Sequence, residues 1–223
     1  MWCIGKITGE YLARMENLLL LYAQPPDEQR PVICLDELPF QLLGEKVAPL
    51  EMKSGAVKKF DYEYERKGVA SVFLAFEPLT GKRLIKVYPR RTKADYCRFQ
   101  QAVVEFWSDA EVICEVQDNL NTHNASSFYE NLPPDQACAL MKRFEFHFTP
   151  KKGSWLNMAE LELSAISRQC LARRIADIET LSRELEIIVK ERNDLEIKVK
   201  WQFTVEQARE KLNRHYEAVM TKN

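Results

Sequence analysis

Three acidic residues stand where the character of the chain changes, and together they constrain the fold more than any other feature. Asp36 follows the apolar run Val32–Leu35, and Asp118 follows a second, largely apolar run, Val112–Gln117. Glu160 lies at the start of a segment with helical periodicity. Carboxylates at the ends of neighbouring buried strands repel one another strongly unless a cation neutralises them. The pattern therefore predicts a divalent metal site where two strands and a helix meet.

The alternation of side chains along a strand selects among neighbouring acids. Asp36 and Glu37 lie on opposite faces of a strand, so both cannot point into one site without a bulge. By the same rule, Asp118 shares a face with Val116, whereas Glu115 lies on the opposite face. We therefore expect Asp36 and Asp118 to be the ligands that the strands contribute.

Helical phase makes the same selection for the third acid. Asn157 and Glu160 lie on one stripe of the predicted helix, whereas Glu162 faces elsewhere. A single Asp at a strand end or Glu in a helix is most often a turn residue or a solvated side chain. The joint pattern instead indicates hard oxygen ligands for Mg²⁺ or Mn²⁺. Two such ions would activate a water or a 3′-hydroxyl and stabilise the leaving oxygen in a phosphoryl displacement.

The remaining periodicities predict an α/β order of elements. An amphipathic helix over 8–22 is expected to act as a linker or docking helix. The first strand is followed by a loop over 39–55 and by antiparallel meander strands over 69–76 and 82–88. The later elements are expected to be helices over 93–108, 124–131, 134–142, 156–171 and 178–188, a strand over 144–148 and a final helix that opens at Thr204.

Composition bounds the class of protein. The 223 residues, 46% of them hydrophobic, suffice for one domain with appended helices. The 32 basic and 33 acidic residues create no global positive field, so any contact with DNA must come from local basic patches. Six cysteines without a C-x-x-C pair are expected to be buried thiols in a reducing cytosol. No apolar stretch reaches 18 residues, so we expect a cytoplasmic protein without a membrane partner.

Basic and aromatic residues near the predicted site are candidates for DNA binding. Arg90 and Arg91 lie at a strand-to-helix junction, and Lys151 and Lys152 precede the predicted acidic helix. Basic residues in such positions bind the phosphate backbone of DNA without reading base sequence. The alternative is that they are solvated residues of a turn with no role in binding. Trp155 is expected either to stack on a displaced base or to pack beneath the helix.

His123 lies five residues beyond Asp118. Near a metal site, an imidazole contacts a phosphate or shuttles a proton. The alternative is a structural histidine that only holds the loop after the strand. With Asn119 and Asn157, His123 is expected to support the site.

Three strings of residues resemble the catalytic core of bacterial insertion-sequence transposases related to the mariner superfamily. They are Cys34–Glu37, Gln117–His123 and Phe146–Glu160, and the resemblance extends over nearly all of the chain. It implies an RNase H-like fold: a mixed sheet with an antiparallel meander and parallel strands, flanked by helices, with a C-terminal helical tail. It also implies that Asp36, Asp118 and Glu160 form the acidic triad of a DDE-type recombinase.

The resemblance further implies a metal-dependent transposase of a mobile element. Such enzymes nick the ends of their own element and join the freed 3′-hydroxyl to target DNA, usually at TA dinucleotides. No covalent protein intermediate is involved. The expected partners are the DNA of the element ends and of the target, and the active complex is expected to be a homodimer. The expected location is the bacterial cytoplasm, at the nucleoid when bound to DNA.

The same comparison predicts the division of the chain. A linker or docking helix is expected over 1–30, the catalytic domain over 31–175 and a helical extension over 176–223. The helix-turn-helix region that relatives usually carry ahead of the core is expected to be absent. Two alternatives stay open: an RNase H-like nuclease without strand transfer, and a truncated, inactive remnant that acts at most as a DNA- or partner-binding module.

Overall fold

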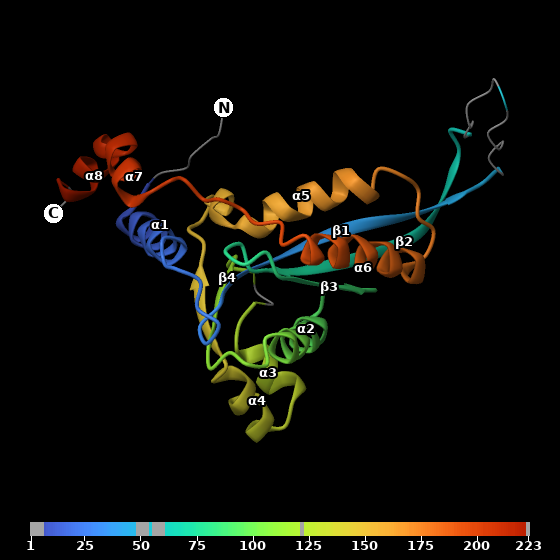
Figure 1. Ribbon diagram of the computed structural model, residues 1–223, viewed down its shortest axis with the longest axis horizontal. Helices are drawn as coiled ribbons and strands as arrows, with labels where there is room; N and C mark the ends of the chain where they lie inside the picture. The colour runs from blue at the N-terminus through green and yellow to red at the C-terminus, as the bar shows by residue number, and fades with distance from the viewer. Residues whose placement is uncertain (1–6, 48–53, 55–60, 121–122, 222–223) are drawn as a thin grey trace.

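The computed structural model describes residues 7–47, 54, 61–120 and 123–221. Within them the chain forms strands β1 (Val32–Glu45), β2 (Tyr64–Phe76), β3 (Arg83–Tyr88), β4 (Ile113–Gln117) and β5 (Phe144–Phe148). They make one mixed sheet in the order β3-β2-β1-β4-β5 (Figure 1). β1, β2 and β3 pair antiparallel as a meander, whereas β4 pairs parallel to β1 and β5 parallel to β4. The predicted combination of a meander with parallel strands is confirmed.

β1 is longer than the sequence pattern predicts, and the expected loop over 39–55 is wrong for its first part. Pro39–Glu45 continue β1 and pair antiparallel with β2. Asp36 therefore lies within β1, and the prediction that it ends the strand is also wrong. Most of the remaining expected loop falls on 48–53 and 55, which lie outside the described residues.

β1 is long because the alternation of core-facing and outward-facing side chains continues past Asp36 and Glu37. Phe40 packs against the core and Leu42 is buried, so a second apolar stretch holds the strand against β2. Pro39 lacks a backbone N–H, but β1 pairs with β4 only as far as Cys34. Beyond that point no described strand pairs with β1 on that side, and proline is accommodated at such an edge of a sheet. Figure 1 shows this part of β1 and β2 projecting beyond the helices.

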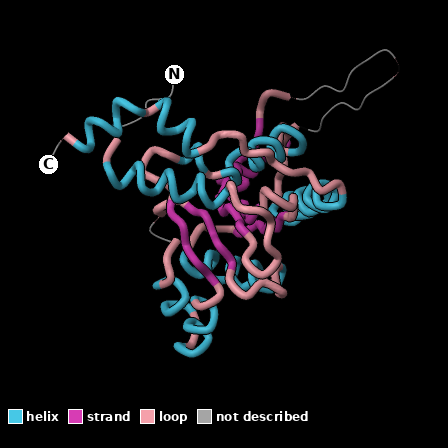
Figure 2. Tube along the Cα trace, turned by 60° about the vertical axis from the view of Figure 1, so that its left-hand side comes forward, coloured by secondary structure: helices cyan, strands magenta, loops and turns pink. Residues whose placement is uncertain are grey.

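Helices cover both faces of the sheet (Figures 1 and 2). They are α1 (Gly9–Tyr22), α2 (Lys93–Phe106), α3 (Ser126–Asn131), α4 (Pro134–Met141), α5 (Met158–Cys170), α6 (Ile178–Asp194), α7 (Val205–Lys211) and α8 (Asn213–Met220). α5 and α6 lie along one face, α2 and α3 cover the other, and α7 and α8 pack against α1. None of the helices in the described ranges is long and apolar enough to cross a membrane. The expected helices are confirmed, except that α6 runs on to Asp194 and the single final helix expected from Thr204 is divided into α7 and α8.

The two faces of β1 belong to two separate core layers. Cys34 is buried in the layer beneath α1, α5 and α6, whereas Ile33 and Leu35 are buried with Phe99 of α2 in the other layer. Burying a large apolar side chain contributes roughly 1.5–3 kcal/mol, so both layers hold the strand firmly. Because side chains alternate along the strand, Asp36 faces the layer of α5 and the next side chain, Glu37, faces the layer of α2.

A buried ion network ties α5 to α6 and to β3. Oε1 of Glu162 accepts a hydrogen bond from Arg192 Nε at 2.6 Å, and Oε2 accepts one from Arg192 Nη2 at 2.9 Å. Arg83 Nε lies 2.9 Å from the same Oε1. The side chains of Arg83 and Glu162 are 0% and 2% exposed. Glu162 thus faces β3 and α6 and not the acids of β1 and β4, as helical phase predicted.

Candidate metal-binding active site

Asp36 and Asp118 stand at the same level of the sheet on neighbouring strands. β1 and β4 pair in parallel up to Cys34 and Val116, and each acid follows two residues later on its own segment. Their phase directs both towards the layer beneath α5. Glu160 lies in the first turn of α5. The structure thus brings the three predicted ligands to one place.

The pKa of Asp36 responds to the charges of the other two acids. Burial raises the pKa of Asp36 to about 7, and the charges of Glu160 and Asp118 add to this effect. The backbone N–H of Glu37 acts against it by donating to Asp36 Oδ1 at 2.8 Å. Carboxylates that repel one another in this way are held together by a divalent cation. The donor set is all oxygen, which fits Mg²⁺ or Mn²⁺.

Asn157 places Glu160 relative to β1. As the residue that caps α5, it accepts a hydrogen bond from the N–H of Ala159 at 3.1 Å. Its Nδ2 donates to the carbonyl of Leu35 at 2.8 Å, one residue before Asp36. The side chain of Asn157 is buried, so both bonds are protected from water. A single amide therefore fixes both the start of the helix and its distance from the strand.

His123 joins Asp118 to Glu37. Its Nδ1 lies 2.7 Å from Asp118 Oδ1, and its Nε2 lies 2.8 Å from Glu37 Oε1. The side chains of His123 and Glu37 are 1% and 3% exposed. Sequence reasoning set Glu37 aside because it faces away from Asp36. The same alternation, however, directs Glu37 towards the loop after β4, which returns on that face.

The two carboxylates control the protonation of His123. Burial alone would lower the pKa of His123, but the hydrogen bonds with Asp118 and Glu37 raise it to about 9. Burial likewise acts to raise the pKa of Asp118, yet the hydrogen bond and charge of His123, with the N–H of Leu120 and the charge of Arg91, together leave that pKa below its usual value. At neutral pH, Asp118 is therefore ionised and His123 is an imidazolium that donates from both nitrogens.

Asn119 connects the site to α1. Its Nδ2 donates to the carbonyl of Thr149 at 2.7 Å, and its Oδ1 accepts from Arg14 Nη1 at 2.6 Å. Arg14 also forms an ion pair with Glu10 at 2.8 Å. Arg14 was missed at the level of sequence because one Arg on the polar side of an amphipathic helix does not indicate a partner 105 residues away.

The predicted DNA-binding cations are exposed. Lys151 and Lys152 lie in the turn between β5 and α5, where Lys152 adopts a left-handed conformation with φ 63°. Arg90 and Arg91 are exposed in the turn before α2. The charge of Arg91 also contributes to lowering the pKa of Asp118, so this side chain acts on the site.

Trp155 lies in an aromatic cluster with the segment between α6 and α7. Its ring is stacked on Trp201 with centroids 6.2 Å apart, and it meets the edge of Phe203 at 5.7 Å. Its Nε1 donates to the hydroxyl of Tyr11 at 3.4 Å. Trp155 thus packs against α1 and the segment before α7, and stacking on a DNA base stays a prediction.

A second cluster of possible ligands lies on β4 and β5. Cys114, Glu145 and His147 each place a ligand atom within 4.8 Å of the other two, a closer grouping than that of the acidic triad. Nη2 of Arg30 lies 2.5 Å from Glu145 Oε2 and 3.7 Å from Cys114 Sγ. Because a guanidinium already supplies the positive charge here, we assign no metal to this cluster.

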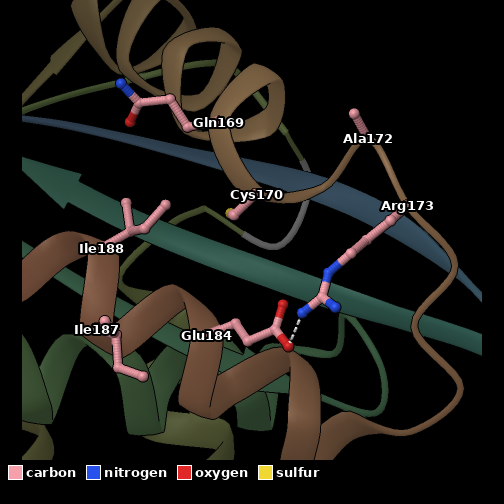
Figure 3. Close-up of a pocket in the computed structure, with 7 residues that line it drawn as sticks. All are labelled: Gln169, Cys170, Ala172, Arg173, Glu184, Ile187 and Ile188. Carbon is pink, nitrogen blue, oxygen red and sulfur yellow. Dashed lines mark hydrogen bonds and ion pairs between the residues drawn. The ribbon is translucent and has the colours of Figure 1, made fainter. Parts of the chain in front are cut away.

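A groove of about 410 Å³ lies between the end of α5 and α6, away from the acids (Figure 3). It is lined by Gln169, Cys170, Ala172, Arg173, Glu184, Ile187 and Ile188. Arg173 and Glu184 form an ion pair across it. None of these residues belongs to the site described above.

The mixed sheet, the helices on both of its faces and the acids on β1, after β4 and on α5 define an RNase H-like catalytic fold. The chain belongs to the DDE superfamily endonucleases, whose family profile matches residues 31–182. Its fold is similar to that of the Mos1 mariner paired end complex with Mn, at 14% identity and a TM-score of 0.53. It is also similar to the pre-cleavage Mos1 transpososome, at 12% identity and a TM-score of 0.55.

These structural matches cover 99% of this chain and 65% of the Mos1 chain, so the chain spans less than two thirds of that protein's length. No curated protein matches the sequence. The chain thus shares its fold with the Mos1 structures, and its family is that of the DDE superfamily endonucleases.

Proposed function

We propose that this chain is the catalytic part of a transposase that cuts the DNA ends of an insertion sequence and joins them to target DNA. The observation that carries the proposal is the meeting of Asp36, Asp118 and Glu160 on one face of a DDE-family fold. The similar Mos1 structures, which include a paired end complex and a strand transfer complex, support it. The division into 1–30, 31–175 and 176–223 is part of the same proposal.

In this proposal, Asp36, Asp118 and Glu160 hold two Mg²⁺ or Mn²⁺ ions. Mos1 has been solved as a complex with each of these metals. Bound ions supply activation of the attacking oxygen and stabilisation of the leaving oxygen. The chain itself holds the carboxylates in place, because Asn157 fixes Glu160 and His123 fixes Asp118.

The side chains of the site argue for direct attack by water or a 3′-hydroxyl. Cys34, two residues before Asp36, is buried, and burial raises the pKa of its thiol to about 11. A protonated, buried thiol is inert as a nucleophile. This agrees with a reaction that forms no covalent protein intermediate.

The proposed partner is DNA, both element ends and a target with a TA dinucleotide, bound by a homodimer. The formal net charge of −1 gives no general attraction to DNA. Lys151, Lys152, Arg90 and Arg91 are exposed and would bind phosphates. Trp155 is the candidate for a base contact.

The test uses the purified chain, Mn²⁺ and a pre-nicked duplex that carries an element end from the DNA flanking its gene. Asp118→Asn removes one ligand charge without changing shape. We expect at least about a 100-fold loss of strand transfer, because metal stabilisation of the transition state is worth several kcal/mol. Asp135→Asn in α4 is the matched control, since Asp135 is exposed and remote from the acids in the sequence and fold.

The products separate the proposal from its alternatives. Strand transfer yields DNA longer than the substrate, as we expect. Shortened products alone would identify a nuclease without strand transfer. DNA binding without any product would identify an inactive remnant, and equal activity in the wild type and Asp118→Asn would contradict the role of Asp118.

A further inference from the structure

Two consecutive residues of β1 reach the same site from opposite faces of the sheet. Asp36 faces α5 and belongs to the triad, whereas Glu37 faces the α2 layer and is almost fully buried. Glu37 nevertheless contacts His123, and His123 contacts Asp118 on the neighbouring segment. The proposed function assigns a role to Asp36 and Asp118 but none to Glu37. Glu37 is thus a buried carboxylate that is linked through His123 to a proposed metal ligand, and burying such a group is costly enough to require an explanation.

His123 is held rigidly enough to transmit a position. Its ring stacks on Tyr96, with centroids 5.0 Å apart and planes 27° apart. Its backbone N–H donates to the carbonyl of Leu120 at 2.9 Å, and its own carbonyl accepts from Gln117 Nε2 at 3.4 Å. The ring therefore cannot turn freely, and its two nitrogens point at fixed acceptors.

The hydrogen bonds to Asp118 select one of its two oxygens. His123 Nδ1 lies 2.7 Å from Oδ1, and the backbone N–H of Leu120 donates to the same oxygen at 3.1 Å. Among the described residues, both donors to this carboxylate act on Oδ1. The carboxylate is thereby oriented with Oδ2 left for a cation.

We propose that Glu37 is a positioning residue that acts through His123 to orient Asp118 towards the metal ions. Nδ1 of His123 lies 2.7 Å from a carboxylate oxygen of Asp118, and Nε2 lies 2.8 Å from one of Glu37. Both ring nitrogens are therefore occupied, and neither is free to bind a metal. The relay therefore also keeps His123 out of the coordination sphere, and the all-oxygen site favours Mg²⁺ or Mn²⁺ over Zn²⁺. This inference rests on the proposed function, because it deepens the role of the triad.

The experiment measures Mn²⁺ binding to the full chain without DNA, by the electron paramagnetic resonance signal of free Mn²⁺. Glu37→Gln keeps the shape of the side chain but removes the charge that anchors His123. We expect the dissociation constant for Mn²⁺ to rise by about 10- to 100-fold, the usual effect of losing a partner of a metal ligand. We also expect the preference for Mn²⁺ over Zn²⁺ to fall in competition titrations.

Glu77→Gln is the matched control. Glu77 is likewise a buried carboxylate on the α2 side, directly after the neighbouring strand β2, but it accepts a hydrogen bond from Trp107 Nε1 at 2.8 Å and has no contact with His123 among the described residues. Its Mn²⁺ dissociation constant should stay within about twofold of the wild-type value, since additivity holds for groups without shared partners. A general effect of removing buried charge would move both variants equally and would overturn the proposal.

His123→Asn gives a second, independent route to the same answer. The Asn amide takes the place of Nδ1 and still donates to Asp118, but it cannot reach Glu37. In this background, adding Glu37→Gln should change Mn²⁺ affinity by less than about twofold, because the relay is already cut. Independent, multiplying effects of the two substitutions would overturn the relay. The double variant keeps the test available even where Glu37→Gln alone unfolds.

Asp118→Asn separates failure of the inference from failure of the proposed function. If Asp118→Asn loses Mn²⁺ binding while Glu37→Gln binds as the wild type does, the relay is wrong and the metal site stands. If the wild type binds no Mn²⁺, both are wrong. Circular dichroism melts of each variant confirm that all titrations are made on folded protein.

Discussion

Glu115 is a buried carboxylate in the middle of β4, where an apolar residue would pack without charge. Its Oε1 accepts a hydrogen bond from Gln100 Nε2 at 2.6 Å. Among the described residues, Glu115 Oε2 and Gln100 Oε1 are both buried acceptors without a donor. Burial raises the pKa of Glu115 to about 8, against the opposing effect of the Gln100 bond. The side chain is therefore mostly protonated at neutral pH, and a proton on it can serve Gln100.

Glu115→Gln should stabilise the protein, and more so as the pH rises. The folded-state pKa lies above the ordinary value of 4.5, so the wild type is fully stable below pH 4.5 and loses stability as the pH rises towards 8. The Gln amide supplies the donor that Gln100 Oε1 lacks without titrating. The gain at pH 8 should reach roughly 1–3 kcal/mol, the usual cost of an unpaired buried group. Thermal melts at pH 5 and pH 8 check this, and an equal effect at both would contradict it.

At the residue scale, strand and helix phase were enough to separate the acids of the site from their neighbours. Phase placed Glu115 and Glu37 opposite the triad, and this holds. The hydrogen-bond partners of Glu115 and Glu37 could not be predicted from the sequence. Gln100 and His123 approach them from α2 and from the loop after β4, and contacts across that distance follow from tertiary packing and not from periodicity.

α5 carries two acidic residues, Glu160 and Glu162, whose side chains face different parts of the molecule. Glu160 turns towards the acids of β1 and β4, whereas Glu162 turns towards β3 and α6. Glu162 alone balances two buried guanidinium groups, those of Arg83 and Arg192. The helix thus presents one carboxylate to the proposed metal site, and the other holds the orientation of the helix.

Glu162→Gln should destabilise the protein by roughly 3–5 kcal/mol, because two buried guanidinium groups lose their counter-charge. Urea unfolding followed by circular dichroism measures the loss. Glu160→Gln is the matched control on the same helix: its unfolding free energy should change by less than about 0.5 kcal/mol, as for partly exposed groups without a structural partner. Similar stability losses in the two variants would contradict this division of tasks.

At the element scale, the order of strands and helices was predictable because each has a clear period. The length of β1 was not. The run Pro39–Glu45 contains Pro39 and Gly44, which typically mark loops, and only pairing with β2 and burial of Leu42 make it a strand. Tertiary pairing here overrides local residue preference.

At the scale of the whole molecule, α1 connects the site to the end of the chain. Arg14 on α1 contacts Asn119 beside Asp118, and Tyr22 donates to the carbonyl of Leu156 just before α5. On its other side, Glu16 accepts from Arg209 of α7 at 2.8 and 2.7 Å and from the hydroxyl of Tyr216 of α8. α1 is therefore an integral part of the folded unit and not a free linker.

Glu16→Gln should loosen α7 and α8 from α1 with little effect on the sheet. The hydrogen bond from Arg209 lowers the pKa of Glu16, so its contribution is present above the ordinary carboxyl pKa and is lost as the pH falls below it. Because the side chain of Arg209 is 61% exposed, water screens the pair, and the effect should be about 0.2–1 kcal/mol. Amide hydrogen exchange should rise over 205–220 and stay unchanged over 113–117. Faster exchange in β4 would contradict a local effect.

The pleat of β1 also determines where this chain tolerates changes of length. A strand shifted by one residue presents every side chain to the opposite face. One inserted or deleted residue between Val32 and Asp36 would therefore exchange the faces of Asp36 and Glu37 in a single step. The ladder with β2 already changes register between Leu42 and Leu43, near Gly68. Length variation among related chains is accordingly expected beyond that irregularity, while the spacing from Val32 to Leu42 stays constant.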